Sequence, residues 1–328
     1  MSTIEAHPAT QQLPQATRTL RGYALVLLAA VLWGSMGVFY KQLMGEHGLP
    51  AITVVFYRAL LTSLMLFAAL AVISLLRRPA AGRAPLHVAR RDLAGFALFG
   101  LIGVAAFYVV YIHAVDQAGV GVAAVLMYTA PAWVTVISAV LLSERLSRRK
   151  GLALALAIGG AALVARIYHL EALSLNVAGV LLGLGAGLGY GIYILCNKVA
   201  VRRYPPWTVL AYALGFGALF MLPFQSGDVL VRALTDLDVV AWLLGVTLFP
   251  TLLAGLSFTL GLRDVPASNA SIVATVEPVV AMMFGAALFS ERLDWPQVLG
   301  GVLILGAVIL LARAPVSPLA SAEKAHHA

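Results

Sequence analysis

The chain has 328 residues, of which 61% are apolar and 11% are charged, and its formal net charge is +8. A mean hydropathy of +0.94 excludes a soluble globular protein and is typical of an integral membrane protein. The single cysteine, Cys196, lies inside an apolar run, which excludes an intramolecular disulfide and a cysteine-based metal site. We therefore expect no cofactor and no metal.

A run of apolar segments separates two polar tails. Residues 1–21 are too weakly apolar for a signal peptide, and residues 314–328 are polar with two prolines, so we expect a cytoplasmic tail at each end. Most apolar segments are close to the ~20 residues that cross a hydrocarbon layer of ~30 Å. The fold class expected is an all-α integral membrane protein. Its ten predicted transmembrane helices are 22–43, 50–75, 93–115, 120–142, 150–166, 175–200, 207–224, 238–261, 266–289 and 295–312.

Basic residues mark the orientation of the chain. Most of its 22 lysines and arginines fall in the tails and in alternate loops, on the same side of the predicted membrane. The positive-inside rule makes that side cytoplasmic, so both termini are expected in the cytoplasm of a multi-pass inner (plasma) membrane protein. The positive charge then indicates orientation, and no nucleic-acid partner is expected.

An internal repeat organises the sequence. The motif Leu-Ser-Glu-Arg-Leu at 142–146 returns 147 positions later as Phe-Ser-Glu-Arg-Leu at 289–293, each at the end of a long apolar segment. The same offset places Pro131 on Pro278. Matches of this kind at one point of the hydropathy profile predict a duplicated membrane unit.

The earlier part of each unit repeats as well, at an offset of 157. The matching positions are Trp33, Gly34 and Lys41 in the first copy, and Tyr190, Gly191 and Lys198 in the second. We therefore predict two five-helix repeats, at 22–168 and 175–313. Because five is odd, the second repeat should cross the membrane in the opposite sense, as is typical of secondary transporters.

In this order the motifs resemble the ten-span EamA-type members of the drug/metabolite transporter superfamily over about residues 22–313. The resemblance implies export or exchange of small polar metabolites, often amino acids or related compounds, driven by a gradient and without ATP. The first repeat departs from the second where Ala130-Pro131 replaces Glu277-Pro278. The motifs that carry the resemblance to this family are Leu32-Trp33-Gly34-Ser35, Lys41, Phe56-Tyr57-Arg58-Ala59, Glu277-Pro278 and Ser290-Glu291-Arg292-Leu293.

Glu277 is the most costly residue within the predicted spans. It falls near the middle of 266–289, where an unpaired carboxylate costs roughly 2.5 kcal/mol or more, so we expect a functional role in proton coupling. The alternative is a neutral or paired Glu277 that only fixes helix packing. Pro278 and its counterpart Pro131 should break their helices at matching positions and are predicted hinges.

Arg58 lies eight residues into its predicted span, so it needs a partner or a wet cavity. It could face a substrate carboxylate, pair with Glu277, or merely pack against backbone carbonyls. The aromatic residues of the matching segments predict a cavity for an amphipathic or ring-bearing solute. Tyr40 and Tyr111 near the span ends are explained by the membrane interface alone. The substrate-binding residues predicted are Trp33, Arg58, Tyr128, Tyr190 and Tyr193.

Other polar and small residues have plainer interpretations. Lys41 and Lys198 lie near span ends and should extend toward the membrane surface. His113 and Asp116 could share a helical face as an acid-base pair, but their position favours interfacial side chains. The glycines at every fourth position from 179 to 191 predict a helix face for close packing, and Gly215 and Gly217 could provide its partner surface.

Motifs for other chemistry are missing from the sequence. There is no phosphate-binding loop, no zinc-binding His-Glu-x-x-His helix and no Gly-x-Ser-x-Gly elbow, so neither an enzyme nor ATP-driven transport is expected. The function predicted is secondary-active transport of small polar metabolites, with protons as an optional coupling partner, by a monomer or homodimer. The alternative is a receptor or scaffold that binds a small ligand and transports nothing.

Overall fold

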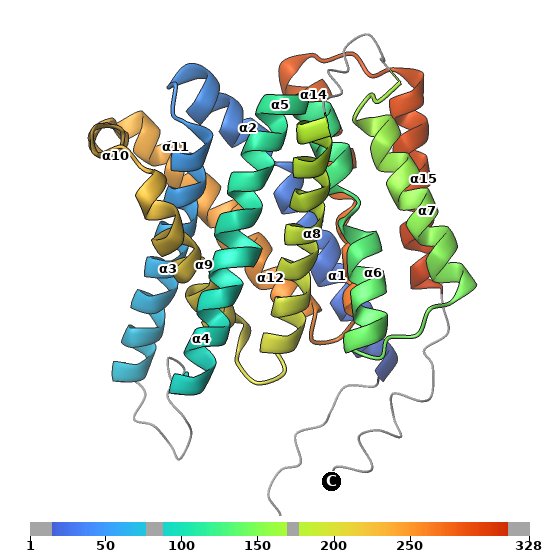
Figure 1. Ribbon diagram of the computed structural model, residues 1–328, viewed down its shortest axis with the longest axis horizontal. Coiled ribbons are helices and arrows are strands. Elements are labelled where there is room, and N and C mark those ends of the chain that lie inside the picture. The colour runs from blue at the N-terminus through green and yellow to red at the C-terminus, as the bar shows by residue number, and fades with distance from the viewer. Residues whose placement is uncertain (1–14, 77–87, 169–176, 314–328) are drawn as a thin grey trace, which may run out of the picture.

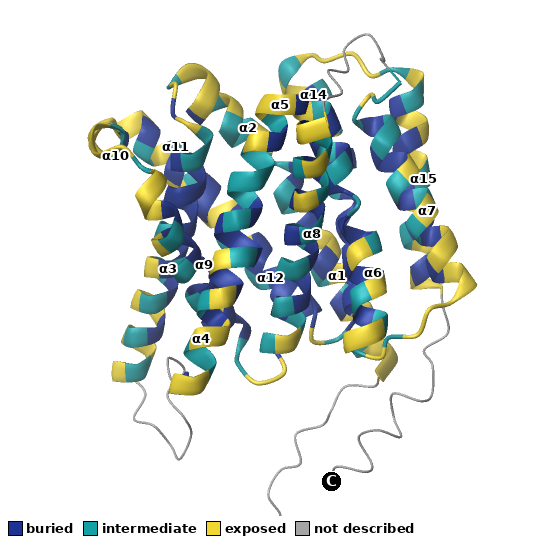
Figure 2. Cartoon of the chain, in the orientation of Figure 1, coloured by how far each residue is buried: buried dark blue, intermediate teal, exposed yellow. Residues whose placement is uncertain are grey.

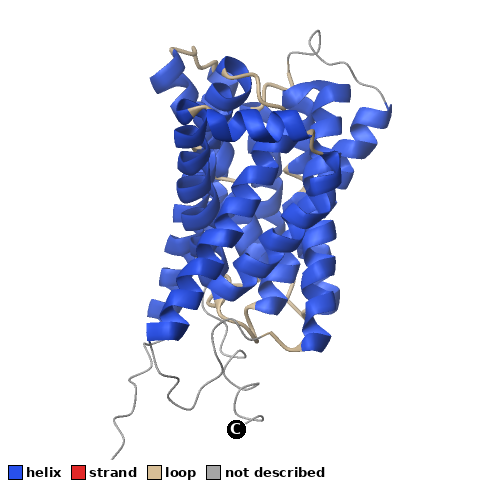
Figure 3. Cartoon of the chain, turned by 90° about the vertical axis from the view of Figure 1, so that its left-hand side faces the viewer, coloured by secondary structure: helices blue, strands red, loops and turns tan. Residues whose placement is uncertain are grey.

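The computed structural model describes residues 15–76, 88–168 and 177–313. Every regular element within them is a helix, and the helices stand side by side as one bundle (Figures 1 and 3). The bounds are α1 (Gln15–Gly34), α2 (Met36–Tyr40), α3 (Ala51–Leu76), α4 (Arg90–Leu98), α5 (Phe107–Met127), α6 (Ala130–Leu141), α7 (Arg148–Val164), α8 (Val177–Ala200), α9 (Pro206–Met221), α10 (Gly227–Thr235), α11 (Leu237–Thr247), α12 (Ala254–Gly261), α13 (Ala267–Ala274), α14 (Glu277–Phe289) and α15 (Trp295–Ala312).

Wider turns join several of these helices without a loop. Residues 41–46, 99–106 and 248–253 are π-helical, and residues 222–224 form a short 3-10 helix after α9. Residues 90–118 of α4 and α5 therefore form one continuous helical rod, which Gly119 interrupts within α5, and α11 and α12 are the ends of another rod. Continuous rods keep their backbone hydrogen bonds internal, as a bilayer requires.

Eight helices or joined helices of the described residues are long and apolar enough to cross a membrane. Helix α6 has only 12 residues, because the chain leaves helical geometry at Tyr128 before it and at Leu142 after it, and α7 has 17, because it ends before Ala165. Ten spans thus remain a prediction. The eight are Gln15–Glu46, Ala51–Leu76, Arg90–Met127, Val177–Ala200, Pro206–Phe224, Leu237–Gly261, Ala267–Phe289 and Trp295–Ala312.

The first helix starts earlier than the sequence suggested. Helix α1 begins at Gln15, so residues 15–21 of the predicted tail 1–21 are helical. Arg21 in this first part pairs with Asp264 at 2.7 Å, and this contact ties the start of α1 to the loop before α13. The rest of that tail, residues 1–14, and the predicted tail 314–328 lie outside the described residues.

The two ends of the bundle can be told apart by the chain itself. The first and last described helical residues, in α1 and α15, lie at the same end, which we call the termini end (Figure 1). Helix α10 lies at the opposite end, the far end. Helix α1 starts at the termini end, whereas its repeat counterpart α8 finishes there.

Local backbone geometry recurs at the 147-residue offset. Ser143 and Ser290 both take left-handed geometry with φ of 55°, and each precedes the glutamate of the repeated motif. Helices α6 and α14 each carry a proline in the first turn, directly after a short turn that separates them from the preceding helix. A proline has no amide hydrogen to donate, so the first turn of a new helix is where it fits best.

The lipid-facing and inward-facing surfaces follow from burial. Large apolar side chains such as Leu76 and Leu141 are more than two-thirds exposed on the outside, whereas the buried residues lie between the helices (Figure 2). The glycine face of α8 packs on the end of α5, where Gly183 contacts Leu126. The predicted partner surface was wrong, since Gly215 and Gly217 face α3 and the π-helical segment 99–106 instead.

Candidate substrate cavity

A cavity of about 460 Å³ occupies the middle of the bundle. Its lining extends to the far end, through Met44, Ala51 and Val120. Among the described residues, none from the loops of the termini end lines it. Pockets of this volume, mostly apolar with a few convergent polar groups, are the usual sites for small ligands.

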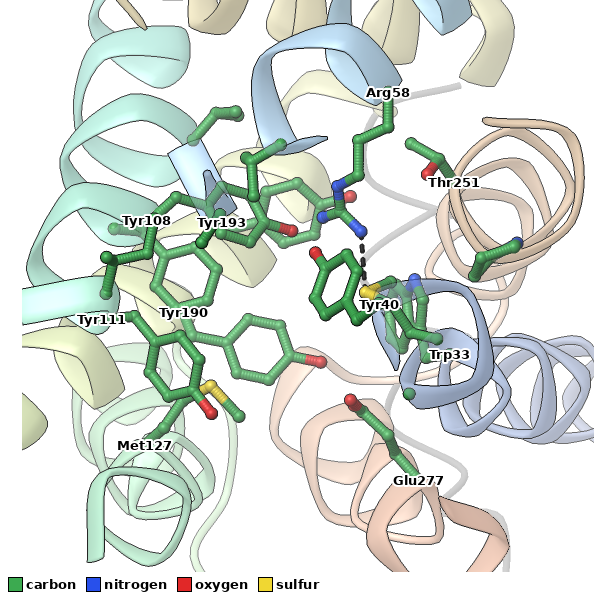
Figure 4. Close-up of a pocket in the computed structure, with 18 of the residues that line it drawn as sticks. Trp33, Tyr40, Arg58, Tyr108, Tyr111, Met127, Tyr190, Tyr193, Thr251 and Glu277 are labelled. Atoms are coloured by element: carbon green, nitrogen blue, oxygen red, sulfur yellow. Dashed lines mark hydrogen bonds between the residues drawn. The ribbon is translucent and has the colours of Figure 1, made fainter. Parts of the chain in front are cut away.

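Arg58 reaches this cavity from α3, although its side chain is only 4% exposed. Its Nη1 donates to the Met36 sulfur at 2.8 Å, and the guanidinium stacks over the Tyr108 ring at 4.7 Å (Figure 4). A thioether is a weak acceptor, and a guanidinium has five donor hydrogens. Arg58 therefore keeps most of its donor capacity for another group.

Glu277 lies on another wall, in the first turn of α14. It is partly exposed to the cavity, which Tyr128 and Arg58 also line. Within the described residues Arg58 and Glu277 form no ion pair, and Figure 4 shows them pointing into the space from opposite sides. The break between α13 and α14 is what turns the carboxylate inward.

Aromatic rings form the walls between these two charges. Tyr190 is the centre of the cluster, stacking on Phe107 at 5.6 Å and meeting Trp33 edge-on at 6.3 Å between ring centroids. Tyr193 stacks near Tyr190 at 6.3 Å. Aromatic pairs at these separations stabilise one another while leaving faces and hydroxyls for a ligand.

All the predicted binding and coupling residues thus line one cavity. They are Trp33, Arg58, Tyr128, Tyr190, Tyr193 and Glu277. The predicted hinges Pro131 and Pro278 do not line it, but both are buried beside the helix breaks next to it. Whether these residues bind a substrate or a proton remains a prediction at this point.

The sequence analysis missed several residues that line the cavity. Tyr40 and Tyr111, which the membrane interface alone explained, are among the lining residues. Each is close to a span end in sequence, but Tyr40 precedes a π-helical turn that carries the helix further, and α5 continues beyond Tyr111. Other residues line the cavity although no motif or repeat in the sequence marked them as part of a site. They include Met36, Tyr108, Met127 and Thr251.

Two lysines use their charge within the protein. Lys198 donates to the carbonyls of Leu262 and Val265 at 2.5 and 2.7 Å, and so caps the end of α12. Lys41 lies over the Phe289 ring at 3.6 Å. Neither simply extends to the membrane surface as predicted, because a helix end or a ring lies within reach of each ammonium group.

His113 and Asp116 make no acid-base pair in the described structure. The His113 ring is exposed and bonds the Val109 carbonyl one turn back at 2.8 Å. Asp116 is exposed at the far end, where it lines the cavity mouth. The plainer interpretation of polar residues at a span end is the one that agrees with this geometry.

An all-helical bundle with apolar outer faces and one central cavity that carries an arginine and a glutamate is the architecture of a membrane transporter. The chain belongs to the EamA-like transporter family, whose model matches residues 20–166 and again 177–313. It is accordingly a multi-pass membrane protein and a transporter rather than an enzyme.

Relatives agree with this assignment, and a solved structure shares the fold. An uncharacterized transporter of Archaeoglobus fulgidus is 31% identical over 88% of this chain and 95% of its own length. A probable terminal-alkyne amino-acid exporter of Streptantibioticus cattleyicolor is 28% identical over 70% of this chain and 77% of its own. A crystal structure with 16% identity superposes with a TM-score of 0.69 over 92% of this chain and 99% of its own, and supports the fold.

Proposed function

We propose that the chain is a secondary-active exporter or exchanger of small polar metabolites, with amino acids and related compounds as the substrate class. The observation that carries this proposal is the pair of opposite charges, Arg58 and Glu277, on different walls of one aromatic cavity. A zwitterion could place its carboxylate at the guanidinium and its ammonium at the carboxylate. Charge-assisted hydrogen bonds of this kind are the strong ones.

The proposed architecture is ten spans in two inverted five-helix repeats, with both termini in the cytoplasm. The far end would then face outward, and the cavity would open to the outside. Transport would follow by alternating access, in which the two repeats rock about a site near the midplane. Among the described residues, the cavity lining extends to the far end and includes none of the loops at the termini end, which supports this mechanism.

Glu277 is proposed to couple transport to protons. In the present state the Arg58 guanidinium contacts Met36 and Tyr108 rather than Glu277. If the two meet in the opposite state, the proton affinity of the carboxyl group differs between states. A proton gradient then biases the conformational equilibrium by linkage.

Flux in proteoliposomes tests both parts. A panel of labelled amino acids and related zwitterions would be offered with and without a pH gradient. Wild-type protein should accumulate at least one of them against its gradient. Glu277→Gln should still exchange that substrate across the membrane but lose the gradient-driven accumulation, because the amide cannot release a proton.

The control is Glu46→Gln, an exposed glutamate near the far end that does not line the cavity, and it should behave as wild type. Normal pH-driven accumulation by Glu277→Gln would reject proton coupling through this residue. Saturable binding of a ligand without any flux would reject the transporter in favour of a receptor or scaffold.

A further inference from the structure

A buried carboxylate joins the two repeats at the termini end. Glu144, the glutamate of the first repeated motif, accepts from the amides of Ala267 and Ser268 at 2.7 and 3.2 Å. It also accepts from the Ser268 hydroxyl and, at 3.2 Å, from the Ser138 hydroxyl. Its side chain is 11% exposed, with the Lys150 ammonium at 3.9 Å. Glu144 therefore caps the first turn of α13, where a negative charge is favoured.

The equivalent contact at the far end is not made. The 147-residue offset places Glu144 on Glu291, and places the start of α13 on Val120 and Gly121. These two residues also begin a helical stretch, because Gly119, with φ of 79° and ψ of 159°, interrupts α5 just before them. Glu291 is exposed, and its carboxylate makes no hydrogen bond or ion pair among the described residues. It lies against Gly285 of its own segment.

The cavity has the same asymmetry. It is lined through to the far end by Met44, Ala51 and Val120, whereas none of its described lining residues comes from the loops of the termini end, where Glu144 joins the repeats. The end that the cavity lining reaches is thus the end without the glutamate cap. Two independent observations, the lining of the cavity and the hydrogen bonds of the two glutamates, agree on this point.

We propose that Glu144 and Glu291 are alternating latches of the transport cycle. In the state described here, Glu144 holds α13 and keeps the termini end closed. In the opposite state Glu144 releases α13, and Glu291 caps the stretch that begins at Val120 and Gly121. This inference rests on the proposed alternating access, and adds the residues that hold each end shut.

The two latches should differ in strength. Ser138, which donates to Glu144, is replaced at the offset by Gly285, and Lys150 is replaced by Gln297. Lys150 also fixes Ser268, since its ammonium donates to the Ser268 hydroxyl at 2.8 Å. The latch at the termini end has an extra hydroxyl donor and a neighbouring positive charge. In the absence of substrate the protein should therefore rest with the termini end closed.

Distances between spin labels report each end without any need for transport. Cysteines at Leu146 and Arg263 span the termini end, and cysteines at His113 and Leu293 span the far end, in a Cys196→Ala background. The side chains at all four positions are exposed. Glu144→Gln should add a longer Leu146 to Arg263 population, shifting the ratio of closed to open forms on the order of tenfold. The His113 to Leu293 distance should shorten in the same sample.

Two further variants complete the test. Ser138→Ala removes a single donor and should shift the same equilibrium in the same direction but less, which keeps the inference testable if Glu144→Gln folds poorly. Glu291→Gln should leave the resting distances unchanged and slow turnover, because only the opposite state uses it. Glu46→Gln is the control for the loss of an exposed far-end carboxylate and should change neither the distances nor the turnover.

Wild-type distances at the termini end in both Glu144→Gln and Ser138→Ala would overturn the proposal, as would turnover by Glu291→Gln equal to that of Glu46→Gln. A distance shift in Glu144→Gln together with no flux by the wild type would reject the proposed function while leaving the latch at Glu144 standing. Flux by the wild type with no distance shift would reject the latch alone.

Discussion

Arg58 combines deep burial with weak internal partners. A buried guanidinium normally pairs with a carboxylate or with backbone carbonyls, but among the described residues the partners of this one are a thioether, through a hydrogen bond, and the face of a ring. Such contacts leave it ready for an anionic group of a ligand. Its place at the cavity wall makes it the residue that should distinguish carboxylate substrates from neutral ones.

Arg58→Ala should therefore weaken binding of carboxylate substrates about 10- to 100-fold, from the ~1.5–3 kcal/mol of a hydrogen bond to a charged group. Neutral analogues of the same size should lose much less. Binding of a matched acid and amide pair to purified protein measures this difference. Lys41→Ala, which removes a cation over Phe289 outside the cavity, controls for loss of charge. An equal loss for acid and amide would make Arg58 a structural residue.

Sequence reasoning found the residues whose presence in a span is costly. Glu277 and Arg58 stand out because a charge in an apolar run must have a use, and Trp33 and Tyr190 stand out by their match between repeats. Tyr40 and Tyr111 could not be placed, because a tyrosine near a span end is equally at home at the interface. Met36 and Thr251 carry no signal at all until the helices are assembled.

At the scale of elements, helix breaks and close packing occur together. The chain leaves helical geometry at Tyr128, in the turn that joins α5 to α6, and Gly187 of α8 lies against this turn. A Cβ added at Gly187 would be 2.6 Å from the Thr129 hydroxyl and 2.7 Å from the Leu126 carbonyl oxygen. Prolines predicted the breaks, and the glycine period predicted a packing face, but neither pattern identified the partner.

Gly187→Ala should consequently destabilise the protein by about 1–3 kcal/mol, the usual cost of overpacking, and lower its melting temperature in detergent. Gly159→Ala in α7 is the matched control. No atom lies within 4 Å of a Cβ added there, so this change should be neutral or stabilise by about 0.5–1 kcal/mol. Equal melting temperatures for the two variants would mean that α8 can shift away from α5 at little cost.

For the whole molecule, the class of fold followed from composition and the order of segments from hydropathy. The number of spans stays a prediction, because eight helices or joined helices of the described residues are long and apolar enough to cross a membrane, and the shorter α6 and α7 are not among them. The break at Gly119 falls in the gap between the predicted spans 93–115 and 120–142, but the residue that makes it could not be identified. Its backbone, with φ of 79°, is one that glycine adopts freely, but a glycine in an apolar segment is also common in packed helices.

Orientation is the property of the whole molecule that a simple measurement decides. Leu146→Cys and Leu293→Cys place a thiol beside each copy of the repeated motif, at exposed positions. In a Cys196→Ala background, a membrane-impermeant reagent should label the first only from the cytoplasm and the second only from outside. Labelling of both from the same side would contradict the inverted repeats.

The π-helical turns give the bundle a further property. Residues 99–106 lead into α5, and residues 248–253 lead into α12, at nearly the same place in the two repeats. Both turns contribute to the cavity wall, through Gly103 and Thr251 among others. A π turn holds one residue more than an α turn, and one residue corresponds to about 100° of rotation at 3.6 residues per turn. Moving that extra residue along the helix would rotate a different set of side chains toward the cavity. The side chains that line the cavity would then change without any tilt of the helix.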